Sequence, residues 1–187
     1  MSLFRDFFIA LSNNTYLNET AKKVGPRMGA NKVVAGNTIP QLIETIQYLN
    51  EYRIAVTVDC LGEFVETKEQ SLLAKQQILE LIEALQYFNV EAHMSVKISQ
   101  LGSKFDLDLA YENMREILLK ADECGKMHIN IDTEKYHSLQ QIQHVLDKLK
   151  GEFKNVGTVV QAYLYEAEDL IDKYPDLRLR LVKGAYK

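Results

Sequence analysis

The stretch AHMSVKI, residues 92–98, carries the main signal about the fold. It is a short run of apolar and β-branched residues, typical of a buried strand, and it holds one cation, Lys97. Apolar residues recur at helical spacing on both sides of it. They are Leu72, Leu79, Ile82 and Leu85 before the stretch, and Met114, Ile117, Leu118 and Ala121 after it. The sequence therefore predicts a strand between two helices.

The same alternation of strand and helix continues along the chain. The other strand-like runs are IAVTVD (54–59), HINID (128–132), TVVQAYL (158–164) and LRLVKG (179–184). Further helices are predicted where Ile142, Val145, Leu146 and Leu149 repeat, and over the short segment 167–174 before Pro175. Such alternation predicts right-handed βαβ units and a parallel sheet.

Signals for helix ends agree with these positions. Capping-box patterns begin at Thr38, Thr67 and Ser138, while Gly125 and Gly151 follow predicted helix ends. No GxGxxG follows the first strand, which argues against a dinucleotide-binding doubly wound fold. The fold class we predict is α/β, a (βα)8 TIM-type barrel with about its first five strands present. Residues 1–37 are expected to form an N-terminal helical arm, and 38–187 the barrel portion.

Composition limits the functional classes. The chain has 187 residues, 47% hydrophobic residues and a formal net charge of -4, so nothing indicates nucleic-acid binding. No apolar run is long enough to cross a bilayer. The apolar face of MSLFRDFFIALS (1–12) predicts a helix packed on the protein body, with a membrane-surface contact as the alternative. Cys60 and Cys124 are expected to be buried thiols in a reducing cytoplasm, and the four histidines form no metal-binding pattern.

Polar residues stand at the ends of the predicted strands. They are Asp59, Lys97, Asp132, Gln161 and Arg180, with Lys183 close behind. In parallel barrels the carboxyl ends of the strands converge on one mouth, where active sites lie. The alternative is that each faces water or caps the next helix, which suits the carboxylates best. Lys97 and Arg180 lie inside apolar runs, and Gln161 lies between Val160 and Ala162, so these three favour a desolvated site.

These residues fall in motifs that resemble the FAD-dependent proline dehydrogenase family. The motifs are VTVDCLGE (56–63), SVKISQLG (95–102), INIDTEKY (129–136), VVQAYLY (159–165) and RLVKGAY (180–186), with VAGNT (34–38) as the entry to the barrel. They occur in the family's order over almost the whole chain. The resemblance implies a distorted (βα)8 barrel that holds FAD at its mouth and oxidises L-proline to Δ1-pyrroline-5-carboxylate, with electrons passing to a membrane quinone.

The resemblance also implies roles for single residues. Lys97 matches the lysine that meets the substrate carboxylate, and Asp132 and Arg180 match the catalytic aspartate and the arginine beside the reactive flavin nitrogen. The cofactor-contacting positions are Thr133, Gln161, Lys183, Gly184 and Ala185. Asp132 is left as a base, a partner for another side chain, or a substrate-orienting group. Tyr186 is a candidate wall of the substrate pocket, or equally a strand-end aromatic residue of the core.

The physical chemistry of these roles can be stated separately. Hydride transfer puts negative charge on the flavin, and a fixed guanidinium in a low-dielectric site stabilises that charge. Arginine suits this better than lysine because it stays charged and holds a planar fork. Gly184 and Ala185 keep the wall low enough for a flat cofactor. Gln161 can both donate and accept hydrogen bonds, as the pyrimidine edge of a flavin requires.

Other interpretations remain open. The family continues through three more strands and a helix with a pair of arginines that hold the proline carboxylate, so we expect the chain to be a fragment without measurable proline oxidation. One alternative is an inactive or partial FAD-binding half-barrel. Another is a different barrel enzyme that uses Lys97 or Lys183 as a Schiff-base amine. The expected location is the cytoplasm, with peripheral contact at the inner face of the membrane.

Overall fold

The computed structural model describes residues 34–61 and 65–184. Helices and strands alternate over these ranges. In chain order they are α3 (Ile39–Glu51), β1 (Val56–Asp59), α4 (Lys68–Tyr87), β2 (Ala92–Val96), α5 (Leu107–Glu123), β3 (Ile129–Ile131), the 3-10 turn η2 (Tyr136–Ser138), α6 (Leu139–Leu149), β4 (Val156–Gln161), α7 (Ala167–Lys173) and β5 (Arg178–Val182). The chain divides into two compact units inside α3, after Thr45, and every element from β1 onward belongs to the second unit. The predicted arm at 1–37 lies mostly outside the described residues.

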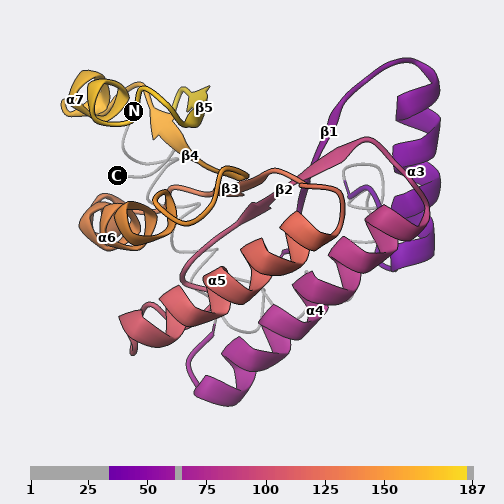
Figure 1. Cartoon of the computed structure of the whole chain (residues 1–187), viewed down its shortest axis with the longest axis horizontal. Coiled ribbons are helices and arrows are strands. Elements are labelled where there is room, and N and C mark those ends of the chain that lie inside the picture. Colours follow the sequence, from indigo (N-terminus) through magenta and orange to yellow (C-terminus); the bar gives the residue numbers. More distant parts are fainter. Residues whose placement is uncertain (1–33, 62–64, 185–187) are drawn as a thin grey trace, which may run out of the picture. The chain divides into compact units, whose positions relative to one another are not determined.

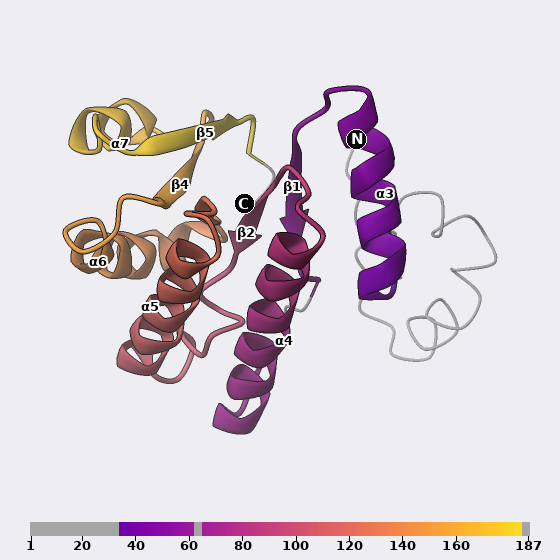
Figure 2. The same ribbon diagram turned by 45° about the vertical axis from the view of Figure 1, so that its right-hand side comes forward.

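The strands form one parallel sheet in the order β1-β2-β3-β4-β5. Spatial order equals sequence order, as expected when each strand is followed by a helix that returns the chain to the next position. Figures 1 and 2 show α4, α5 and α6 side by side along the sheet. The result is a half-barrel of five parallel strands alternating with helices, which confirms the predicted class of fold.

The core lies between the sheet and these helices. All four apolar residues predicted for the face of α5 are fully buried, and those predicted for α6 are at most 2% exposed. In α4 the buried face is made by Ser71, Ile78, Leu81, Ile82 and Leu85. Leu72 lies in a helix, as its spacing predicts, but it is 38% exposed and stands outside this face. The buried face of α4 therefore includes Ser71 and not the adjacent Leu72.

The capping boxes predicted at the helix starts form at Thr67 but not at Ser138. Thr67 forms a full capping box before α4, in which its side chain accepts from Gln70 N at 3.3 Å and Gln70 Oε1 accepts in return from Thr67 N. Helix α6 begins directly after Ser138, as predicted, but Ser138 makes no side-chain capping bond, so the predicted capping box does not form. Residues 136–138 form a 3-10 turn, which leaves Ser138 helical (φ -87°) where a cap needs extended backbone. Before α3, Asn37 N donates to the side chain of Gln41 at 3.0 Å.

The predicted helix ends also differ. Gly125 follows α5 with φ of +81°, the left-handed conformation expected there. Gly151, which comes after α6, is not among the described residues with positive φ, so the prediction for it is wrong. The chain instead leaves α6 through Lys150 in helical geometry.

At the amino ends of the strands, the sheet carries a polar layer on one face. Arg178 Nη1 lies 2.9 Å from His93 Nε2, and the rings of His93 and His128 meet edge-on with centroids 5.7 Å apart. His128 Nε2 lies 3.1 Å from Asn130 Oδ1. Burial, followed by the Arg178 charge, lowers the pKa of His93; for His128 burial is again the largest cause of a lowered pKa. Gly157 packs against this layer, since an added Cβ would lie 2.8 Å from the His128 ring.

Candidate active site

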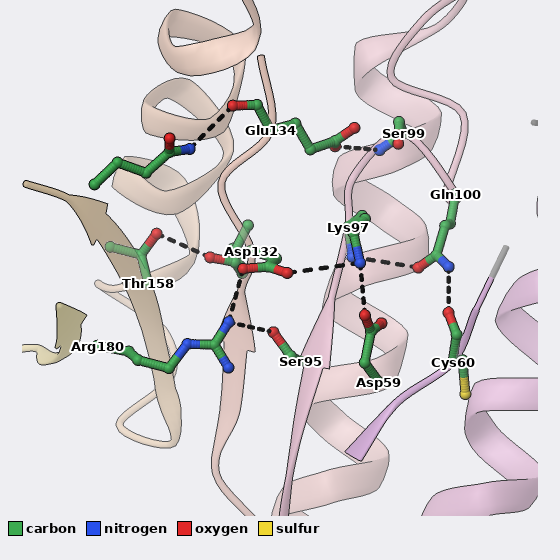
Figure 3. A network of polar contacts seen from close by, with 12 residues as sticks. Asp59, Cys60, Ser95, Lys97, Ser99, Gln100, Asp132, Glu134, Thr158 and Arg180 are labelled. Carbon is green, nitrogen blue, oxygen red and sulfur yellow. Dashed lines mark hydrogen bonds and ion pairs between the residues drawn. The ribbon is translucent and has the colours of Figure 1, made fainter. Parts of the chain in front are cut away.

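The carboxyl ends of the strands bring the predicted polar residues together. Asp59 ends β1, Gln161 ends β4, and Arg180 lies inside β5. Lys97 and Asp132 each follow directly after the last residue of β2 and β3. Figure 3 shows the four charged side chains of this set pointing toward one another from their separate strands.

The four charged residues form a continuous chain of ion pairs. Lys97 Nζ donates to Asp59 Oδ2 at 2.7 Å and lies 3.6 Å from Asp132 Oδ2. On the other side of Asp132, Arg180 Nη2 donates to its Oδ1 at 2.8 Å and to Ser95 Oγ at 3.2 Å. The Lys97 side chain is only 7% exposed, and a charge buried to this degree is tolerated because it is paired. The network therefore fixes both cations.

Neighbouring polar side chains form hydrogen bonds with the backbone of the segments that follow β1 and β2. Gln100 Oε1 accepts from Lys97 N at 3.3 Å, while its amide donates to Cys60 O at 2.5 Å. Glu134 Oε1 accepts from Ser99 N at 3.2 Å (Figure 3). Sequence reasoning assigned no role to these residues or to Ser95. For Ser95 a signal existed, since it stands two positions before Lys97 and so shares its face of the strand.

Two buried polar atoms at the same end of the sheet lack partners. Gln161 is 3% exposed, and its Nε2 donates to Glu134 O at 3.1 Å. Within the described ranges, Gln161 Oε1 and Arg180 Nε are buried without a hydrogen-bond partner. Because leaving such groups unpaired is costly, these two atoms are candidate contacts for a ligand. Gly184 is close by with φ of +96°, and an added Cβ would overlap the ring of Tyr163.

The remaining predicted residues lie apart from the network or outside the described ranges. Thr133 is 7% exposed and lines a small cavity with Leu139 and other residues of the helix-covered face of the sheet. Lys183 is exposed. Ala185 and Tyr186 fall outside the described residues. Their assigned roles stay predictions.

Both cysteines are partly exposed, so the prediction of buried thiols is wrong. Burial nevertheless raises the pKa of Cys60 to about 11, and the neighbouring Asp59 charge acts in the same direction. Its thiol is therefore protonated at neutral pH and is a poor nucleophile. Over the described ranges, no group of three or more His, Cys, Asp or Glu could hold a metal ion, and no helix there is long and apolar enough to span a membrane.

The fold and the charged mouth define a barrel-type α/β protein whose site is built at the carboxyl ends of parallel strands. The proline dehydrogenase family model matches residues 42–187, so the chain belongs to the proline dehydrogenase family. It is 39% identical to proline dehydrogenase 2 of Bacillus subtilis (strain 168), over 98% of this chain and 61% of that protein. It is 35% identical to proline dehydrogenase 1 of the same strain, over 99% of this chain and 62% of that protein.

Solved structures agree on the fold. Proline utilization A from Bdellovibrio bacteriovorus, inactivated by N-propargylglycine, superposes with a TM-score of 0.76 and 22% identity, over 85% of this chain and 20% of that one. Proline utilization A from Bradyrhizobium japonicum (mutant D779Y) superposes with a TM-score of 0.67 and 21% identity, over 81% and 18%. The chain spans about 62% of the length of the curated Bacillus relatives it matches.

Proposed function

We propose that this chain provides the mouth of a proline dehydrogenase, which oxidises L-proline to Δ1-pyrroline-5-carboxylate with FAD as hydride acceptor. Membership of the family implies proline as the substrate and FAD as the family's cofactor. The observation that carries the proposal is the fixed guanidinium of Arg180. It is held by Asp132 and Ser95, on the face of the sheet where Gln161 has an unpartnered oxygen.

The residues present fit a flat, polar-edged cofactor. Gln161 Oε1 can accept a hydrogen bond and Arg180 Nε can donate one, so together they match a ring edge that carries both donors and acceptors. Gly184 has no side chain, so the ring of Tyr163 packs directly against its backbone and forms the wall there. On this basis Gln161, Gly184 and Arg180 would hold FAD. The proposed contacts of Thr133, Lys183 and Ala185 with FAD are supported by the family resemblance alone.

The roles of the charged residues follow from their pairing. Bound FAD would supply the hydride acceptor for the carbon beside the proline nitrogen, and the reduced cofactor would carry more negative charge. Arg180 stabilises that charge, and Asp132 and Ser95 orient its guanidinium so that little reorganisation is needed during the reaction. Lys97 supplies the cation for the substrate carboxylate, with Tyr186 as a wall of the substrate pocket. Asp132 acts by restraining the two cations it touches.

The same proposal covers the electron acceptor and the location. Electrons from proline pass on to a quinone, and we place the protein in the cytoplasm with peripheral contact at the inner face of the membrane. Support for this part comes from the family resemblance alone.

A Schiff-base mechanism is less well supported. A nucleophilic lysine must lose its proton, and a neutral amine is favoured by desolvation or by a neighbouring cation. Lys97 instead lies within 4 Å of the carboxylates of Asp59 and Asp132, which favour its charged form. Borohydride should therefore trap no adduct on Lys97 or on the exposed Lys183 when a carbonyl compound is added.

FAD binding tests the proposal. The purified chain is incubated with FAD and desalted, and its absorbance between 350 and 500 nm is recorded; the affinity is measured by titration. Gln161→Leu should weaken FAD binding about 10-fold, because it removes the proposed hydrogen bond to the cofactor as well as the bond from Gln161 Nε2 to the partly buried Glu134 carbonyl, which holds the side chain in place. Gln140→Leu, on the exposed face of α6, is the matched control and should bind as the wild type does. Absence of FAD binding by the wild-type chain would contradict the proposal.

A further inference from the structure

The polar layer at the amino ends of the strands holds an arginine beside two histidines. Arg178 is exposed, and its Nη1 lies 2.9 Å from His93 Nε2. The ring of His93 meets the ring of His128 edge-on. Within the described ranges, no carboxylate lies within 4 Å of any of these three side chains. The guanidinium therefore rests against an imidazole, with no carboxylate of the described residues paired to it.

The hydrogen bonds of this layer determine which nitrogen of each imidazole carries the proton. A guanidinium can only donate, so His93 Nε2 accepts, and the proton of the neutral ring is on Nδ1. His93 Nδ1 is buried and has no partner among the described residues. His128 has the opposite tautomer, because its Nε2 lies 3.1 Å from Asn130 Oδ1, which can only accept. With both rings neutral, the layer carries the single positive charge of Arg178.

Hydrogen-bond donors of this layer remain unused. Arg178 makes only the bond to His93 within the described ranges, so its other N–H groups are available. The strand register places Arg178, Gly157 and Asn130 at one level of the sheet. At that level the amide nitrogen of Asn130 makes no hydrogen bond to a described residue. An oxyanion held here would meet the planar donor fork of a guanidinium and a neighbouring amide.

We propose that Arg178, Asn130 and His93 form an oxyanion-binding site at the amino ends of the strands, and that anion binding is coupled to protonation of His93. The ligand is a small oxyanion, such as sulfate, phosphate or a carboxylate. Neutral His93 supports the guanidinium through its acceptor nitrogen. Protonated His93 cannot accept from Arg178, and its Nε2 becomes a second donor, so an anion oxygen between the two side chains receives hydrogen bonds from both. The site lies away from the mouth and requires neither FAD nor proline.

The charges around His93 give the coupling its direction. Burial is the largest cause of the lowered pKa of His93; the Arg178 charge also lowers it, and the Glu91 charge raises it. On β1 the paired residue, Thr57, is uncharged. A bound anion offsets the Arg178 charge and should therefore raise the pKa of His93. By linkage, the same anion binds more tightly as the pH falls through the range in which His93 gains its proton.

His128 should respond less than His93. Burial is again the largest cause of its lowered pKa, and its Nε2 is held by Asn130 rather than by the guanidinium. His128 also lines a cavity with two carboxylates and two ammonium groups, which balance in charge: Asp122, Glu152, Lys126 and Lys154. A difference between the two histidines therefore locates the anion beside Arg178.

The experiment is an NMR titration of the purified chain with sulfate, at an ionic strength held constant with sodium chloride. The imidazole ¹⁵N shifts report the tautomer and protonation of each histidine. Before sulfate is added, His93 should be the Nδ1–H tautomer and His128 the Nε2–H tautomer. Sulfate should raise the pKa of His93 more than that of His128. It should bind about 10-fold more tightly at about pH 5.5 than at about pH 8, as expected for one additional charge-assisted hydrogen bond.

Variants separate a binding site from a contact that only ties β5 to β2. Arg178→Gln should weaken sulfate binding at least about 10-fold, since it removes the charge and the fork. His93→Gln keeps an acceptor for Arg178, so it should bind as the wild type does at about pH 8 but lose the dependence on pH. Arg53→Gln is the matched control, because it removes the same charge from an exposed position in the turn before β1. Circular dichroism checks that each variant folds. If Arg178→Gln does not fold, Arg178→Lys, which keeps the charge without the fork, should still weaken binding.

Acetate, titrated in parallel, shows whether the site accepts planar carboxylates as well as tetrahedral oxyanions, and saturable binding of either one supports it. The inference is overturned if neither anion changes the His93 signals in a saturable way at either pH. It is also overturned if sulfate binding survives Arg178→Gln in a folded variant, because the anion then binds elsewhere, for example at Arg180 in the mouth. Neither result bears on the proposed function, which FAD binding tests separately.

Discussion

Replacing Gly157 with alanine should destabilise the protein by forcing two strands apart. Gly157 lies in β4 and pairs with Arg178 of β5. An added Cβ would overlap the Arg178 carbonyl oxygen, which is backbone and cannot swing aside. It would also lie 2.8 Å from two atoms of the His128 ring. Either β5 moves outward or the ring leaves its position against Asn130.

The magnitude can be worked out from the cost of overpacking a filled site. Extra methyl groups in a well-packed interior cost roughly 1–3 kcal/mol, and the backbone contact places Gly157→Ala near the top of that range, at about 2–3 kcal/mol. For a domain of this length that corresponds to a fall in Tm of about 4–12 °C. The assay is urea unfolding followed by circular dichroism, together with a thermal scan.

Gly151→Ala is the matched control. The nearest atom to its added Cβ is Lys148 O at 3.9 Å, which is an ordinary contact, and Gly151 has no positive φ. This variant should be as stable as the wild type or gain up to about 1 kcal/mol from the lower entropy of its unfolded chain. Equal stability of the Gly157 and Gly151 variants would refute the close approach of β4, β5 and His128.

Two further predictions concern caps and pH. Thr67→Ala should lower the free energy of unfolding by about 1 kcal/mol in urea titrations, because it removes a capping bond. Ser138→Ala removes no capping bond and should change that free energy by less than about 0.5 kcal/mol. Equal losses in the two variants would contradict the observed caps. Because burial lowers the pKa of His93 and His128, the unfolded chain binds more protons below about pH 6.5, so stability should fall as the pH falls from 7.5 to 5.5. Replacing both histidines with glutamine should flatten the dependence of stability on pH, whereas His144→Gln, at an exposed position, should leave it unchanged. An unaltered slope in the double variant would contradict the assignment of the pH effect to His93 and His128.

The sequence predicted the order of the elements because each strand is a run of apolar residues bounded by turn residues. The features it missed depend on contacts made within a few residues or across the sheet. The pattern at Ser138 is correct for a cap, but the 3-10 turn before it removes the extended geometry that a cap needs. Leu72 has the right spacing, yet α4 is rotated so that Ser71 is buried instead. Spacing alone does not determine which of two adjacent residues faces the core.

The sequence predicted which residues belong to the site, but only partly how these residues pair with one another. The strand-end rule located Asp59, Lys97, Asp132 and Arg180, because parallel strands end at one edge. Which cation meets which carboxylate depends on strand register and side-chain length. Lys97 and Asp59 are 38 positions apart, and no local pattern joins them. The support from Ser95 was equally hidden, since it comes from a residue 85 positions away from Arg180.

The pairing register of β5 with β4 matters for the proposed chemistry, because β5 carries two arginines that reach across the sheet. Arg178 reaches His93 and Arg180 reaches Ser95, and both partners lie on β2, which is separated from β5 by two strands. Arg178 passes over β4 and β3, and at its level β4 presents Gly157, which has no side chain in the way. Arg180 lies two positions further along β5, opposite Val159, so a shift of β5 at Gly157 should also move the backbone that carries Arg180. Displacing β5 should weaken the hold of Asp132 on Arg180, so Gly157→Ala should also lower the affinity for FAD, even though it lies outside the ion-pair network.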